Sequence, residues 1–334
     1  MSKKMLLLVG VLFAAAVLMT ACAGPAGPEG PAGPAGPAGP AGPAGADGAP
    51  AMAADLTCTE CHTDTTLITG KETAWAESGH GTGTAFARGT SASCAGCHSG
   101  GGFSAMIAAG LNNTEVTEGD PNPTRQDCRT CHQIHTTYTD ADWALETTDP
   151  VTLTVSGLVF DGGEGNLCAN CHQSREMVEA VDGMIEVDST HWGPHHGPMA
   201  DMLLGTTGYG VEGKPAAHSS MVENTCVTCH LGEGADHSFE PAVAACQTCH
   251  ADATSLDING VQTEVEAKLE ELKAKLVEAG LLTDAGGIVV GTYPEAQGAA
   301  LWNYIFVEED RSMGVHNASY TEALLDWSLA QFEQ

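Results

Sequence analysis

A pentapeptide of the form Cys-x-x-Cys-His occurs six times between residues 58 and 250 of this 334-residue chain. The two cysteines of each copy are Cys58 and Cys61, Cys94 and Cys97, Cys128 and Cys131, Cys168 and Cys171, Cys226 and Cys229, and Cys246 and Cys249. The histidines that end the copies are His62, His98, His132, His172, His230 and His250. Two thiols at this spacing can add to the vinyl groups on one porphyrin edge, and the histidine then supplies a proximal imidazole to the iron. The motifs therefore predict six covalently bound haem c groups.

Two other kinds of site use paired cysteines. Twelve such residues could form three Cys₄ zinc sites or, in a secreted chain, six disulfides. Neither arrangement requires a histidine directly after the second cysteine of every pair. The repeated histidine therefore favours haem over both alternatives.

The histidines outside the motifs are numerous enough to supply a second axial ligand to every iron. Of 14 histidines, eight lie outside the motifs: His80, His135, His191, His195, His196, His218, His237 and His316. Eight spare imidazoles for six irons predict bis-histidine ligation throughout. As distal ligands we assign His80, His135, His196, His218, His237 and His316.

The stretch Thr-His-Trp-Gly-Pro-His-His-Gly-Pro contains three of these histidines, and its prolines and glycines preclude a regular helix. In an extended chain, His195 and His196 would point to opposite sides. We favour His196 as the ligand, keep His195 as second choice, and assign no iron to His191.

These segments resemble the multihaem c-type cytochrome superfamily, which includes pentahaem nitrite reductases, hydroxylamine oxidoreductase and the surface cytochromes of metal-reducing bacteria. The likeness rests on the six motifs, on Ser-Gly-His80, on Cys-His-x-x-His135, on Trp192-Gly-Pro-His-His-Gly-Pro198 and on Ser312-Met-Gly-Val-His316-Asn317, and it covers residues 56–334. It implies closely packed haems, alternately stacked and perpendicular, that pass electrons along the protein.

The N-terminus predicts export and a lipid anchor. Residues 1–21 combine two lysines with an apolar run from Met5 to Met19, as in a signal peptide. The following Cys22 resembles the acylated cysteine of a bacterial lipobox, and the alternative is an ordinary cleavage site with a coincidental cysteine. Acyl chains at Cys22 would hold the protein to the outer membrane, at its cell-surface or periplasmic face.

A collagen-like repeat follows Cys22 in segment 22–50. Nine Gly-x-y triplets run from Gly24 to Pro50, mostly as Gly-Pro-Ala. As a single polyproline stalk these residues would span roughly 84 Å at about 3.1 Å per residue. As a triple helix they would make a homotrimer. We favour the stalk because nine triplets with almost no charge pairs are marginal for an independent triple helix.

Composition limits the partners and the core. The formal net charge is −31, which excludes nucleic acid as a partner because a phosphate backbone requires a basic face. Aromatic residues make up only 5% of the chain, so the porphyrins should supply much of the apolar interior. By the logic of small metal domains, the protein without haem should be largely unfolded.

Residues 51–334 are expected to form a mainly α domain with a high proportion of irregular loop, organised around six haems, with C-terminal helices. A short hairpin is expected at 151–160 in the motif region 58–250. In segment 260–334, an apolar stripe predicts a helix that starts at Val261 and ends at Gly280, and two more are expected at 299–309 and 321–332.

These features favour an electron carrier over an enzyme. The expected function is transfer of electrons through bis-histidine haems between redox protein partners or to an extracellular acceptor. One alternative is a reductase of nitrite, hydroxylamine or a sulfur oxyanion with one open-site haem. Another is a cytochrome filament subunit, in which a neighbour supplies an axial ligand. No catalytic residue is assigned, and no motif ends in the lysine found in pentahaem nitrite reductases.

Overall fold

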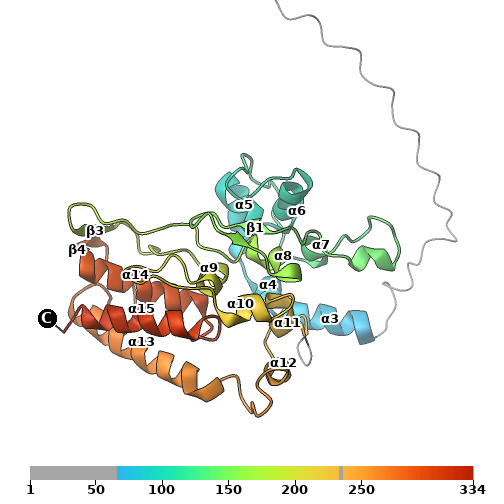
Figure 1. Cartoon of the computed structure of the whole chain (residues 1–334). Coiled ribbons are helices and arrows are strands. Elements are labelled where there is room, and N and C mark those ends of the chain that lie inside the picture. Colours follow the sequence, from blue (N-terminus) through green and yellow to red (C-terminus); the bar gives the residue numbers. More distant parts are fainter. Residues whose placement is uncertain (1–65, 233–235, 334) are drawn as a thin grey trace, which may run out of the picture. The chain divides into compact units, whose positions relative to one another are not determined.

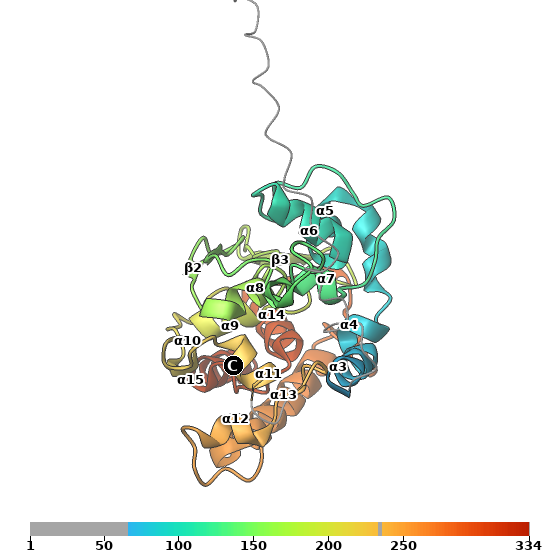
Figure 2. The same cartoon turned by 90° about the vertical axis from the view of Figure 1, so that its right-hand side faces the viewer.

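A computed structural model describes residues 66–232 and 236–333 (Figures 1 and 2). The signal peptide, Cys22, the Gly-x-y repeat and the first motif, Cys58 to His62, lie outside the described residues. Within the described ranges, no helix is both long and apolar enough to traverse a lipid bilayer.

Short helices joined by long loops make up the region of the Cys-x-x-Cys-His motifs. They are α3 (Thr66–Glu77), α4 (Gly79–Thr82), η3 (Ala85–Thr90), α5 (Ala92–His98), α6 (Gly100–Ala108), α7 (Cys128–Cys131), η4 (Asp140–Trp143), η5 (Gly163–Gly165), α8 (Asn166–Ala169), α9 (Met199–Leu204), α10 (Ala217–Met221), α11 (Cys226–His230), α12 (Val243–Gln247) and η6 (Ile258–Gly260). This mostly helical, loop-rich architecture agrees with the fold class expected from the sequence.

The described part of the chain also contains two small antiparallel sheets of two strands each. Strand β1 (Val151–Thr152) pairs with β2 (Val159–Phe160) at the position where a hairpin was expected. Strand β3 (Met184–Val187) pairs with β4 (Gly291–Pro294), with Ile185 opposite Tyr293. The second sheet was not expected, because its strands are about a hundred residues apart in the sequence. It fastens the motif region to the C-terminal helices.

Three longer helices, α13 (Val261–Glu278), α14 (Glu295–Asp310) and α15 (Ala318–Ala330), pack side by side (Figure 1). The stripe expected on α13 is buried at Val265, Leu269, Leu272 and Leu276. Lys268 joins α13 to α15 through an ion pair with Asp326, 2.8 Å between Nζ and Oδ1. Helix α14 begins four residues before the expected start at 299, and α15 begins three before 321 and ends two before 332.

Helix α14 is enclosed on all sides, which its expected amphipathic character did not indicate. Every residue from Gly298 to Val307 is buried. The Trp302 indole N–H donates to the Thr207 carbonyl at 2.8 Å, and Asn303 exchanges hydrogen bonds with the backbone of Tyr209. Residues 207–209 of the motif region are therefore fixed directly to the central C-terminal helix.

Candidate haem sites

Each described motif is built on or beside a short helix. The backbone N–H of His132 donates to the Cys128 carbonyl at 2.9 Å, and His172 and His250 make the same bond to Cys168 and Cys246. One helical turn places residues three and four apart on a common face. The two thiols and the imidazole of a motif can therefore meet one porphyrin edge and its iron.

The structure places a spare histidine opposite the histidine of each described motif. Ring centroids are 5.9 Å apart for His98 and His195, 6.1 Å for His172 and His80, and 6.4 Å for His132 and His237, for His250 and His218, and for His230 and His316. Most partners are distant in sequence. Five motif regions thus present facing imidazoles at nearly one separation.

This separation fits two axial ligands on one iron. An imidazole nitrogen binds a first-row transition metal at about 2.0–2.1 Å, so each ring centre lies about 3 Å from the metal, and two rings on opposite sides lie about 6 Å apart. The donor set, two thiols and two imidazoles at each motif, is that of a bis-histidine haem c.

Hydrogen bonds orient several of these rings. The Nδ1 atom of His132 lies 2.7 Å from the Trp143 carbonyl, that of His230 lies 2.7 Å from the Phe239 carbonyl, and that of His218 lies 2.9 Å from the Val315 carbonyl. A carbonyl accepts, so Nδ1 carries the proton in each case. Nε2 is then the nitrogen available to a metal.

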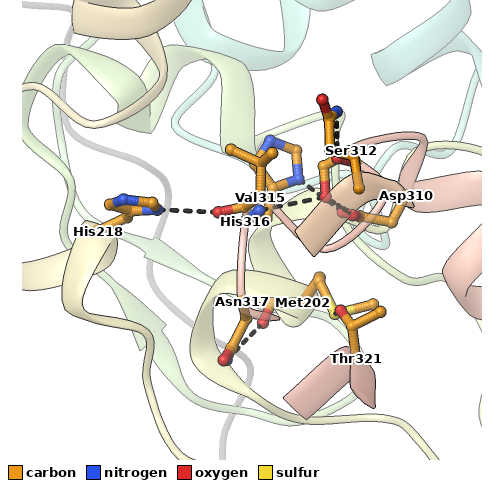
Figure 3. A network of polar contacts seen from close by, with 9 residues as sticks. Met202, His218, Asp310, Ser312, Val315, His316, Asn317 and Thr321 are labelled. Atoms are coloured by element: carbon orange, nitrogen blue, oxygen red, sulfur yellow. Dashed lines mark hydrogen bonds and ion pairs between the residues drawn. The ribbon is translucent and has the colours of Figure 1, made fainter. Parts of the chain in front are cut away.

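His316 has a carboxylate partner instead. Its Nδ1 lies 2.7 Å from Oδ1 of Asp310, which is only 1% exposed, and the Ser312 hydroxyl donates to Oδ2 of the same carboxylate at 2.5 Å (Figure 3). Burial lowers the pKa of His316, but Asp310 more than offsets this, and the net shift is upward.

The loop between α14 and α15 serves two sites at once. Val315 accepts from His218, and the next residue, His316, faces His230. Asn317 fixes the end of this loop by donating to the Met202 carbonyl at 3.1 Å (Figure 3). It also donates to the Lys214 carbonyl at 2.9 Å. The C-terminal helices therefore position the distal histidines opposite both the fifth and the sixth motif.

Burial favours the neutral form of three of the facing rings, the form that binds metal. It lowers the pKa of His172 to about 4, and it lowers that of His195 to about 4 with a further contribution from His196. The pKa of His80 is lowered by burial as well. These rings are unprotonated at neutral pH.

The preference for His196 over His195 does not agree with this geometry. His195 faces His98, while His196 is 64% exposed and its Nδ1 lies 2.7 Å from Oε1 of Glu309. The expectation assumed an extended chain, but His195 has φ 77° and Gly197 has φ 82°. These left-handed residues turn His195 toward the second motif.

The two other spare histidines have different neighbours. His191 is exposed and its Nδ1 lies 3.4 Å from the Thr190 hydroxyl. His135 stacks on Tyr138 with ring centroids 5.4 Å apart, and its backbone N–H donates to the buried Asp142 carboxylate at 2.8 Å. Asp142 thus shapes the loop that presents His135.

The alternative sites for paired cysteines are not formed in the described part of the chain. There, the cysteines of the second to sixth motifs are free, and no group of three or more His, Cys, Asp or Glu side chains is arranged to hold a metal ion. The thiols are therefore not arranged for zinc.

Comparisons with known proteins place these sites in context. No protein-family model matches the chain. Over 149 residues it is 28% identical to the C-type polyheme cytochrome OmcC and 29% identical to OmcB, both of Geobacter sulfurreducens. The match covers 35% of this chain and 19% and 20% of those proteins, so it spans about a fifth of their length.

The fold has a neighbour among crystal structures. The outer cell wall cytochrome OcwA superposes with a TM-score of 0.51 at 22% identity, over 78% of this chain and 50% of that one. The proteins that this chain matches in sequence are thus C-type polyheme cytochromes, and its fold resembles that of a cytochrome.

Proposed function

We propose that this protein is an exported electron-transfer cytochrome that binds six haem c groups, each with two axial histidines. The haems supply reversible one-electron exchange, and the chain attaches them, orients them and excludes other axial ligands. The redox partners are other proteins or an extracellular acceptor.

One observation carries the proposal. Five motif histidines each face a spare histidine at 5.9–6.4 Å between ring centroids, as a bis-histidine iron requires. With both axial positions taken, a substrate has no place to bind iron at these five sites. This favours an electron carrier over a reductase.

We assign His135 to the haem of the first motif, as the axial ligand opposite His62. His191 is exposed beside Thr190, and the His196 ring contacts Glu309, whereas His135 follows His132 by three residues, where it can reach a neighbouring haem. The distal set becomes His80, His135, His195, His218, His237 and His316.

Mass spectrometry and EPR spectroscopy of the mature oxidised protein test the proposal together. We expect six covalent haems and low-spin iron only. Free thiols, bound zinc or disulfides would overturn haem attachment. One high-spin haem together with turnover of nitrite or hydroxylamine would identify a reductase instead.

The N-terminal proposal is a lipid anchor at Cys22 followed by a stalk that holds residues 51–334 away from the outer membrane. Cys22→Ser should release the protein from membranes without changing haem content, because anchor and haem motifs are separate in the chain. Membrane association that persists in this variant would show that the lipobox is coincidental. Sedimentation of the mature protein distinguishes a monomer from a collagen-type trimer or a filament.

A further inference from the structure

The fourth motif contacts the second motif through their cysteines. Cys97 Sγ lies 3.8 Å from the Asn170 carbonyl, and Cys171 Sγ lies 3.9 Å from the Gly96 carbonyl. The x-x residues of each motif therefore touch a cysteine of the other.

The chain near His195 makes the same connection from the distal side. His195 faces His98 of the second motif. Two residues later, a Cβ on Gly197 would lie 3.1 Å from Nδ1 of His172 in the fourth motif. One short segment thus touches axial histidines of both sites.

The fourth motif contacts the fifth through a cysteine of the fifth. Cys226 Sγ lies 3.8 Å from the Gly165 carbonyl next to α8, and Cys226 packs against the apolar cluster that contains Ala169 of the fourth motif. These two motifs are therefore adjacent.

Phe239 connects the third site to the fourth. Its ring centroid lies 4.8 Å from that of His80, opposite the fourth motif, and 6.1 Å from that of His237, opposite the third. Its carbonyl accepts from His230 of the fifth motif. In addition, Cys131 and Cys171 pack against one apolar cluster with Phe103, Met106 and Leu167. The axial ligands of three sites therefore meet at one residue.

The sixth motif is joined to the fifth. His218, which faces His250, donates to the Val315 carbonyl next to His316, which faces His230. Helices α11 and α12 of the two motifs are also in contact.

We infer that the haem bound by Cys168, Cys171, His172 and His80 is a three-way junction, adjacent to those of the second, third and fifth motifs. The inference rests on the proposed function and adds an order in space. Electron tunnelling weakens steeply with separation, so the fourth site offers a short route among these three sites, and the sixth is reached by way of the fifth. The network is branched and does not follow the order of motifs in the chain.

A test uses one high-spin iron as a magnetic probe. His80→Ala removes a ligand from the fourth site, and His218→Ala, the matched control, removes one from the sixth. A high-spin ferric iron broadens the EPR signals of low-spin irons near it. The ring angles, 25° for His132 and His237 against 86° for His98 and His195, give distinct signals that help assignment.

We expect His80→Ala to cause loss of intensity in the signals of at least three other haems, and His218→Ala in fewer. The junction would be overturned if His80→Ala affected the signals of two or fewer other haems. It would also be overturned if His218→Ala affected as many haems as His80→Ala does. If His80→Ala does not assemble, then His195→Ala, His237→Ala and His316→Ala should all broaden one common signal, and the absence of a common signal would also overturn it.

Failure of the junction and failure of the proposed function are separable. A wild-type protein without covalent haem, or with high-spin iron, contradicts the proposed function. A fully low-spin wild type whose variants affect the wrong number of neighbours contradicts only the junction.

Discussion

Asp310 is a buried carboxylate in contact with a proposed axial ligand. The other hydrogen-bonded rings, His132, His218 and His230, use backbone carbonyls. An anionic acceptor makes an imidazole a stronger donor to the metal than a neutral one does. Asp310 should therefore stabilise the ferric state at the fifth site and lower its reduction potential.

Asp310→Asn should raise the potential of one haem by about 60 mV, a tenfold change in a one-electron equilibrium. Spectroelectrochemical titration measures this directly. The matched control is the neighbouring Glu309→Gln, which alters the partner of His196, a residue assigned no iron. Equal shifts in the two variants would mean that general loss of charge, not contact with His316, is responsible.

His195 and His196 provide a comparison of adjacent residues. His195→Ala should convert one low-spin haem to high spin, because it removes the imidazole that faces His98. His196→Ala should leave every haem low spin. Optical and EPR spectra of the two oxidised variants check this, and a high-spin signal from His196→Ala alone would restore His196 as the ligand.

At the scale of elements, the C-terminal helices act as a support for ligands in the motif region. The loop from Asp310 to Asn317 connects α14 to α15 and orients the rings opposite the fifth and sixth motifs. Gly298 permits the close packing of α14 on β3, since a Cβ there would lie 2.7 Å from the Ile185 Cβ. Packing of these helices is therefore coupled to two haem sites.

Leu272→Ala in α13 should lower the free energy of unfolding by about 2–5 kcal/mol, because Leu272 is fully buried in the largest apolar cluster. The exposed Glu266→Ala on the same helix should have little effect. Thermal unfolding followed by far-UV circular dichroism compares them, with the Soret band as a reporter of the haem sites. Equal stability of the two variants would show that α13 is not needed to hold the domain together.

At the scale of the whole molecule, apolar packing is unevenly distributed. The largest cluster joins α13, α14 and α15 and includes Leu272, Leu301 and Phe306, whereas the cluster beside the second and fourth motifs centres on Phe103, Met106 and Leu167. Without porphyrin, the motif region is left with this cluster and a second small one that includes Leu153, Phe160 and Leu203.

The sequence led us to expect a largely unfolded protein in the absence of haem, whereas this distribution predicts that structure is lost unevenly. We expect residues 66–250 to lose protection from hydrogen exchange while α13 to α15 retain part of theirs. Hydrogen exchange with mass spectrometry, with the haem-loaded protein as control, measures this. Uniform loss of protection would show that the C-terminal helices also depend on haem.

The amino-acid sequence by itself determined the features that act over a few residues. Covalent haem attachment needs only two thiols and an imidazole within one helical turn, so the motifs could be recognised directly. The stripe on α13 follows the helical period, and its buried positions were predictable for the same reason.

Only the tertiary structure decided which histidines face one another. His80 and His172, or His132 and His237, are about a hundred residues apart, and their pairing depends on the path of the whole chain. The choice of His195 over His196 depends on the left-handed backbone of His195 and Gly197. The enclosure of α14 and the β3–β4 sheet likewise arise from long-range packing, which no local period or spacing encodes.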